Sequence, residues 1–263
     1  MFVEEPRLDN VLQVPDIASI FCLGIRRAWR DRLQAYPARD SIVGRVRLWG
    51  VEPMTGIAEL WRSQDARMWG EALARYWDFV LPANLDLERR MESLDIEHIR
   101  RLDADAWYDF LLNEYFRWKY TARNRYASTT KHLRQYADAG ALAALAGIKD
   151  RLFAFDLSDI GAGLSIASDI KGLGPTGASG LLAVMFPAAF GTADQFVVKA
   201  LRSVLDVPES SLVAKMKPDQ LTLPGAAVLI AIMRRKAAEN NHVFRTSTWT
   251  PRMVDKVLWT YGR

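Results

Sequence analysis

The chain has 263 residues, of which 50% are hydrophobic and 25% are charged, and its formal net charge at pH 7 is +4. This is the composition of a globular protein that can bury one large core. The single cysteine, Cys22, excludes an intrachain disulfide and any four-cysteine zinc or iron–sulfur site. The small basic excess permits nucleic-acid binding without arguing for it.

The sequence contains no signature of a metal site, a cofactor site or a membrane anchor. The three histidines, His98, His132 and His242, are far apart and have no metal-ligand spacing. The N-terminal residues MFVEEPRLDN lack the basic-then-apolar order of a signal peptide. No uncharged apolar run approaches the length of a membrane span. We therefore expect a cytoplasmic protein without metal or cofactor, whose oligomeric state the sequence leaves open.

Apolar residues recur at helical spacing along almost every long segment, which predicts a mainly α protein. The clearest stripes lie in residues 17–33, 56–81 and 103–120, the last of which begins with acids suited to a helix N-terminus. Residues 41–53 are the best candidate for an extended piece or a hairpin, and residues 207–225 are typical of a long connection between helices. Most of the nine tryptophans are expected in the core.

We expect residues 1–263 to form a single compact unit, because no disordered linker interrupts the chain. Within it, residues 105–188 would form one helical lobe, and residues 1–104 together with 189–263 would form the other. A cleft between the lobes is the expected place for a functional site.

A glycine-rich turn precedes one of the predicted helices, in the sequence IKGLGPTGASGLL (residues 170–182). Gly172 and Gly174 would allow a positive φ and would leave no side chain above the backbone. Such a turn before a helix start exposes several N–H groups that can bind a phosphate, and Lys171 adds a cation. The alternative is an ordinary connection between helices that uses glycine for steric reasons.

The turn and the aspartate that follows it resemble the helix–hairpin–helix (HhH-GPD) superfamily of DNA glycosylases. In that family the hairpin has the pattern L-P-G-h-G-x-[K/S/T]-T-A-x-x-h-L, and a catalytic aspartate begins the next helix. Here FGTADQFVVKAL (residues 190–201) contains Asp194, eighteen residues after Thr176, which matches the family's separation. The resemblance is firm over residues 166–205 and diffuse elsewhere.

Three departures from the family pattern limit what the resemblance implies. Lys171 replaces the usual proline before the first glycine. Thr176 stands where bifunctional glycosylase/lyase members have lysine, so a lysine Schiff base at that position is excluded. The four-cysteine iron–sulfur cluster found in many members is absent. The resemblance therefore implies a divergent, cluster-free, monofunctional member that contacts double-stranded DNA through Lys171, Gly172, Leu173, Gly174 and Thr176.

Asp194 is the candidate catalytic residue. Breaking an N-glycosidic bond builds positive charge on the sugar, as glycoside hydrolysis does. A carboxylate near C1′ would stabilise that charge and orient the attacking water. The alternative role for Asp194 is to cap the helix that follows, and the two roles are compatible.

A basic and aromatic stretch, YFRWKYTARNRYASTTKHLRQYA (residues 115–137), contains six Lys/Arg residues and no acid. Cations for phosphates and ring faces for an extruded base are what a base-flipping enzyme requires. The alternative is a helix whose aromatic residues face the core while its cations face water. We expect a mixture, in which Phe116 packs inside and Trp118 and Tyr120 line a base pocket. The cations Lys119, Arg123 and Arg125 would contact DNA or a base.

The C-terminal sequence STWTPRMVDKVLWTYGR predicts a helix that Ser247 or Thr250 caps and that has Pro251 in its first turn. Arg252 would then lie at the helix start, either beside the base pocket or as an ordinary surface arginine. Trp249 and Trp259 are expected to be packing residues.

Three functions fit these observations. The first is a DNA glycosylase that removes a damaged or modified base, in base-excision repair or in defence against phage DNA. The second is a non-catalytic DNA-binding protein that uses the hairpin only for phosphate contact. The third is a helical protein with no nucleic-acid role. The sequence does not identify the base.

Overall fold

The structure, a computed structural model, describes residues 56–263, and this part of the chain is helical throughout, without a strand. The mainly α fold class is therefore confirmed. The expected helix at 17–33, the extended piece at 41–53 and Cys22 lie outside the described residues. Residues Pro53–Arg263 form one compact unit, and its division into lobes stays a prediction.

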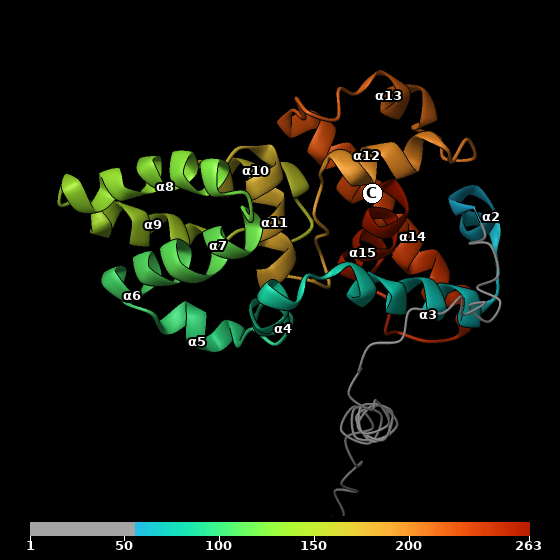
Figure 1. The fold of residues 1–263 in the computed structure, drawn as a ribbon, viewed down its shortest axis with the longest axis horizontal. Helices are drawn as coiled ribbons and strands as arrows, with labels where there is room; N and C mark the ends of the chain where they lie inside the picture. Colours follow the sequence, from blue (N-terminus) through green and yellow to red (C-terminus); the bar gives the residue numbers. More distant parts are fainter. Residues whose placement is uncertain (1–55) are drawn as a thin grey trace, which may run out of the picture. The chain divides into compact units, whose positions relative to one another are not determined.

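The elements follow one another with short connections (Figure 1). Those of the first half are α2 (Ile57–Arg62), α3 (Ala66–Ala74), η1 (Arg75–Phe79), η2 (Pro82–Asn84), α4 (Leu85–Glu92), α5 (Ile96–Arg101), α6 (Ala104–Asp109), η3 (Phe110–Tyr115), α7 (Phe116–Lys119) and α8 (Arg123–Asp138). Those of the second half are α9 (Leu142–Leu152), α10 (Ile160–Ser168), α11 (Pro175–Met185), α12 (Gln195–Arg202), α13 (Ser210–Lys215), α14 (Leu223–Phe244) and α15 (Pro251–Gly262).

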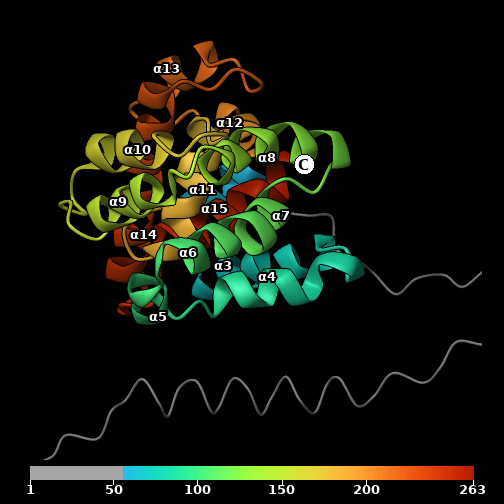
Figure 2. The ribbon, with the colours of Figure 1, turned by 90° about the vertical axis from the view of Figure 1, so that its left-hand side faces the viewer.

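Two helices organise the packing. The C-terminal helix α15 contacts α3, α12 and α14, so segments far apart in sequence lie side by side (Figures 1 and 2). Helix α10 contacts α9, α11 and α14. Helices α15 and α12 approach closely at Gly262, where an added Cβ would overlap the backbone of Phe196. In the described residues, no helix is long and apolar enough to cross a membrane.

The helix boundaries agree with the capping signals in the sequence. The Asp103 side chain accepts from the N–H of Ala106 at the start of α6, as the acids at the start of 103–120 predict. Of the two predicted caps for the last helix, the structure selects Thr250, whose hydroxyl accepts from the N–H of Met253.

Two expectations about continuity are wrong. Residues 56–81 are not one helix, because Ser63 adopts an extended conformation after α2 and Asp65 caps a new helix, α3. Residues 207–225 are not only a connection, because they contain the short helix α13, whose Val213 is buried. In both cases local capping and burial determine where helices begin and end, which the spacing of apolar residues does not predict.

A π-helical segment, η3, joins α6 to α7 without a break. Wide turns of this kind occur mostly within α-helices and often at functional sites. Tyr115 and Phe116, at the end of this segment, are fully buried, which confirms the expected inward packing of Phe116. Trp118 and Lys119 follow directly, and both line the cavity described below.

The core contains the tryptophans Trp61, Trp69, Trp107 and Trp249. Trp69 contacts both Trp61 and Trp249, with ring centroids 6.0 and 5.4 Å apart. The packing role expected for Trp249 is thus confirmed. Trp118 and Trp259 are only partly buried, and both line the cavity.

Candidate functional site

The turn between α10 and α11 needs glycine at only one of its two expected positions. Gly172 has φ +96°, and a Cβ there would lie 2.5 Å from the carbonyl oxygen of Thr129 on α8. Gly174 has φ −85° and open space around it, so the expected positive φ is wrong for this residue. Gly174 is instead the exposed N-cap of α11, and Pro175 occupies the first helical position.

Helix α8 packs directly against this turn. The ammonium of Lys171 lies 5.0 Å from the ring centroid of Tyr136, whose hydroxyl also accepts from the Lys171 N–H. Lys171 itself is exposed, as are Arg123 and Arg125 in the first turn of α8, whereas the Leu173 side chain is buried. Any contact of Leu173 with a ligand would therefore involve its backbone.

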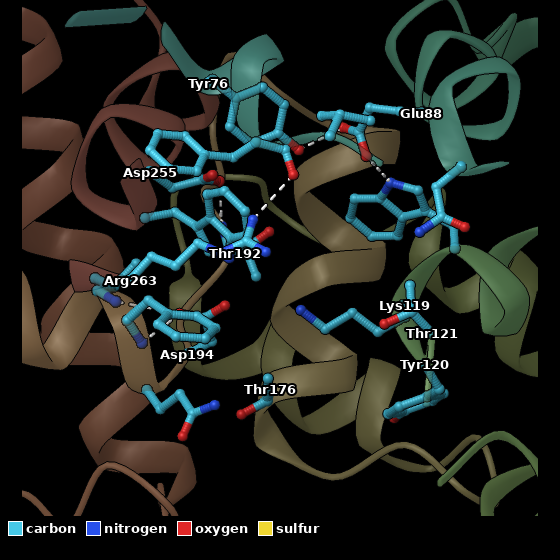
Figure 3. A pocket seen from close by; sticks show the side chains of 18 of the residues that line it. Tyr76, Glu88, Lys119, Tyr120, Thr121, Thr176, Thr192, Asp194, Asp255 and Arg263 are labelled. Carbon is cyan, nitrogen blue, oxygen red and sulfur yellow. Dashed lines mark hydrogen bonds between the residues drawn. The ribbon is translucent and has the colours of Figure 1, made fainter. Parts of the chain in front are cut away.

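A cavity of about 510 Å³ lies where α4, α7, α11, α12 and α15 come together (Figure 3). Its volume is in the range of small-molecule sites, about 300–1,000 Å³. It brings together seven of the residues selected from the sequence: Trp118, Lys119, Tyr120, Arg125, Thr176, Asp194 and Arg252. The other five, Lys171, Gly172, Leu173, Gly174 and Arg123, do not line it.

Asp194 caps α12 with one of its two carboxylate oxygens. Oδ1 accepts from the N–H groups of Phe196 and Val197, at 2.9 and 3.1 Å. Within residues 56–263, Oδ2 accepts no hydrogen bond. Because the helix start fixes the side chain through Oδ1, the second oxygen remains available at the cavity wall. Capping and a role in the cavity are thus compatible.

The extended residues before Asp194 are held from two sides. The N–H of Ala193 donates to Ser179 on α11 at 3.0 Å, and the N–H of Thr192 donates to Asp255 on α15 at 2.5 Å. A Cβ at Gly191 would lie 2.7 Å from the Pro251 carbonyl oxygen. The path of the chain into Asp194 is therefore fixed by both helices.

One wall of the cavity contains a buried charge network centred on Arg252. Its guanidinium donates to Asp255 at 3.0 Å and to Glu88 and Glu92 at 3.3 Å. Arg252 is 6% exposed, so it is neither a surface arginine nor a free group in a pocket. The other members of the network are Lys256, which pairs with Glu92, and Tyr76 and Trp118, which both donate to Glu88.

Burial dominates the acid–base behaviour of this network. Desolvation raises the pKa of Asp255 to about 6, although the neighbouring Arg252 and the Thr192 N–H oppose the shift. Burial would also raise the pKa of Glu92, but the nearby Arg252 and Lys256 outweigh it and lower that pKa. As the pH falls, Asp255 therefore gains a proton before Glu92 does.

Lys119 lies on the facing side of the cavity, and its ammonium points toward the space beside Asp194 and Thr192 (Figure 3). Within the described residues it makes no hydrogen bond and no ion pair, and its nearest ring is that of Trp118, 5.7 Å from the ammonium. Its stem crosses α11 at Gly180, where a Cβ would lie 3.2 Å from the stem carbons. Burial lowers the pKa of Lys119, and the nearby Asp194 partly opposes this shift.

Aromatic rings form much of the remaining wall, from Phe79, Trp118, Tyr120, Phe196 and Trp259. Tyr120 also connects the cavity to the glycine turn, because its hydroxyl donates to the carbonyl oxygen of Gly172 at 3.3 Å. An added Cβ at Gly177 would collide with this hydroxyl, which explains the third glycine of the motif. Burial raises the pKa of Tyr120 to about 12, so it is a neutral donor at physiological pH.

Sequence reasoning missed most of the charge network. Asp255 is three residues after Arg252 on the same helix, so helical spacing could have identified it. Glu88 is 164 residues from Arg252 in the sequence, and no local signal connects the two. Trp259 was expected only to pack, yet it also lines the cavity.

No protein-family model, curated protein sequence or solved structure matches the chain significantly. In residues 56–263, no group of three His, Cys, Asp or Glu side chains could hold a metal ion. The features that point to a function are therefore the cavity and the residues around it.

Proposed function

We propose that the protein is a monofunctional DNA N-glycosylase that removes a damaged or modified base from double-stranded DNA and leaves an abasic site. The observation that carries the proposal is the second carboxylate oxygen of Asp194. It belongs to a side chain that is fixed by a helix start and that lines a cavity with aromatic walls.

This geometry suits hydrolysis of the bond between a base and its sugar. As the bond breaks, positive charge develops at C1′, and a carboxylate fixed nearby stabilises it without reorganising. The same oxygen can accept a proton from the attacking water. Because Oδ1 already accepts two N–H groups, the side chain has little freedom to turn away from this position.

The aromatic wall suits an extruded base. An enzyme that acts on a base must take it out of the duplex and bind it in a pocket, where ring faces replace the lost stacking. Trp118 and Tyr120 are the rings nearest to Lys119 in sequence, and Trp259 lines the same cavity from α15. In this proposal the base enters between them while its sugar lies beside Asp194.

The glycine turn and the start of α8 are the proposed surface for the DNA backbone. Gly174 is exposed at the N-cap of α11, where the helix leaves its first N–H groups unpaired. Lys171, Arg123 and Arg125 are exposed cations on the turn and on the helix packed against it. Tyr120 connects this surface to the cavity through its hydrogen bond to Gly172.

A DNA-binding protein without catalysis is the alternative. A protein of this kind would account for the turn and the basic side chains. A carboxylate beside the bound DNA would weaken its binding, because the carboxylate repels phosphates. The cavity and the free Asp194 oxygen therefore favour the enzyme. The proposed activity serves repair and defence against modified foreign DNA equally well.

Asp194→Asn tests the enzyme directly, because it keeps the shape and much of the capping ability of the side chain but removes its charge. We expect base release to fall on the order of a thousandfold or more, with DNA binding retained. The matched control is Asp159→Asn, since Asp159 caps α10 in the same way but does not line the cavity. Release would be measured as alkali-labile strands in duplexes with single modified bases and in phage genomic DNA. Release by Asp194→Asn at the wild-type rate would contradict the mechanism.

Gly174→Val tests the proposed DNA surface. The structure has open space around Gly174 and an ordinary φ, so the variant should fold. A branched side chain at the N-cap would hold a phosphate away from the helix start, and we expect about tenfold weaker binding to all duplexes, whatever their bases. Binding would be measured over a range of salt concentrations, because phosphate contacts set the salt dependence. Unchanged affinity would remove the turn from the proposed surface.

A further inference from the structure

Lys119 differs from the charge network around Arg252 and from Asp194, which line the same cavity. The cations and carboxylates around Arg252 are paired with one another, and Asp194 is held by backbone N–H groups. The ammonium of Lys119 points into the cavity without a hydrogen bond or ion pair to any residue that the structure describes (Figure 3). A half-buried cation that faces a cavity without a hydrogen bond or ion pair to the protein is available to a ligand.

The Lys119 side chain packs against a helix face that has room for it. The stem of Lys119 lies across α11 where Gly180 has no side chain, and Trp118 borders it on its own helix. Gly180 is buried in the middle of α11, where glycine weakens a helix by about 1 kcal/mol relative to alanine. The position of the ammonium is therefore built by two helices rather than left to chance.

We infer that Lys119 donates a proton to the departing base, and that the site is consequently specific for uncharged bases with an acceptor atom. This inference rests on the proposed glycosylase function. Asp194 serves the sugar from one side of the cavity, and Lys119 serves the base from the other. The two groups thus divide the reaction between its two separating fragments.

The proposed step is balanced. The bond between C1′ and the base nitrogen breaks, and its electron pair moves to the base. The ammonium of Lys119 gives one proton to the base, which leaves as a neutral molecule. The oxygen of a water molecule bonds to C1′, and the released proton passes to the Asp194 carboxylate. Transfer of that proton from Asp194 to the amine then restores both side chains.

The same geometry selects among substrates. An uncharged base with a carbonyl oxygen or a ring nitrogen can accept from Lys119 and needs its proton to leave. A base that already has a fixed positive charge needs no proton and meets a like charge in the cavity. Specificity here combines attraction for one class with repulsion of the other.

The test uses four duplexes, each with a single uracil, hypoxanthine, 8-oxoguanine or 7-methylguanine, the last of which is the cationic base. Single-turnover release would be measured for the full chain, for Lys119→Met and Lys119→Arg, and for Lys199→Met as a control. Lys199 is an exposed lysine of α12 that does not line the cavity. Folding of each variant would be checked by its thermal unfolding.

We expect the wild type to release at least one uncharged base and not 7-methylguanine. Lys119→Met should slow this release about a hundredfold or more, whereas Lys199→Met should not. Lys119→Arg should retain more activity than Lys119→Met, because it keeps a donor. The wild-type rate should fall at high pH, where the amine loses its proton, and this fall should be absent in Lys119→Met.

Three results would overturn the inference while leaving a glycosylase in place. They are equal rates for the wild type and Lys119→Met, preferred release of 7-methylguanine, and a borohydride-trapped adduct that disappears in Lys119→Met, which would make Lys119 a nucleophile. Release of none of the four bases by the wild type would instead overturn the proposed function on these substrates, and the inference with it.

Discussion

Two groups of charged residues at the cavity differ in how their charges are paired. In the network around Arg252, the guanidinium is buried with Asp255, Glu88 and Glu92, and each of these charges has a partner. In the second group, Lys119 makes no hydrogen bond or ion pair with the described residues, and Asp194 keeps one oxygen free of hydrogen bonds. Both arrangements lie within one cavity of about 510 Å³.

The difference separates groups that hold the site from groups that can act in it. A buried charge that is hydrogen-bonded to several oppositely charged partners is held in one position within the protein. A charge without a partner is less stable where it is, but it is free to bind a ligand. The Thr192 N–H connects the charge network around Arg252 to Asp194, because its bond to Asp255 fixes the chain that leads to Asp194.

The largest expected effect is the loss of stability when Arg252→Met disrupts the charge network around Arg252. This change leaves Glu88 and Asp255 without their common cation, and an uncompensated buried carboxylate costs about 3–5 kcal/mol of stability. The control is Arg67→Met, which removes the exposed pair with Glu71 and should cost less than about 1 kcal/mol. Urea unfolding of both variants measures the comparison. A loss below 1 kcal/mol for Arg252→Met would mean that the network is not a stabilising unit.

A second prediction concerns how the stability contributed by Asp255, in the charge network around Arg252, depends on pH. Burial raises the pKa of Asp255 to about 6 from its ordinary value near 3.8, so the unfolded chain loses this proton first as the pH rises. Between pH 4 and 6 the folded protein therefore binds more protons, and its stability falls with rising pH because of this group. The stability of the wild type relative to Asp255→Asn should thus decrease across this window by on the order of 3 kcal/mol and be constant above about pH 7.

Unfolding measured at closely spaced pH values would check this prediction. Because the two proteins differ only at residue 255, the other titrating groups cancel to first order in the difference. A relative stability that increases from pH 4 to 6 would show that Asp255 has a lowered pKa, as an ordinary ion-paired carboxylate does.

What the sequence could predict follows from the range of its signals. Helical periodicity and capping residues act over a few positions, so they predicted the mainly α fold, the acidic helix start at Asp103 and the helix start at Asp194. For the last helix they gave two candidate caps, Ser247 and Thr250, of which the structure selects Thr250. The turn at Gly172 was also local, although the companion prediction for Gly174 was wrong because only one residue of the turn needs a positive φ.

The cavity itself depends on contacts that no local pattern contains. Glu88 meets Arg252 across 164 residues, and Tyr120 meets Gly172 across 52. The sequence marked Lys119 as a cation for DNA or a base, and Arg252 either as a cation beside the base pocket or as a surface arginine. Only the packing distinguishes them, since it surrounds Arg252 with carboxylates and leaves Lys119 facing open space.

The smallest predicted effect on stability is that of Lys119→Met, and it contrasts most sharply with the effect of Arg252→Met. Lys119→Met removes a cation of the same cavity as Arg252→Met does, but no carboxylate of the described chain pairs with Lys119. Burial lowers the pKa of Lys119, so the folded state disfavours the charged amine. An unbranched apolar side chain packed beside Gly180 in the same way should therefore be tolerated. We expect the variant to be as stable as the wild type at pH 7, or more stable by up to about 1 kcal/mol, while losing activity. Urea unfolding would decide the matter, since a destabilisation comparable to that of Arg252→Met would show that Lys119 belongs to the groups that hold the site rather than to those that act in it.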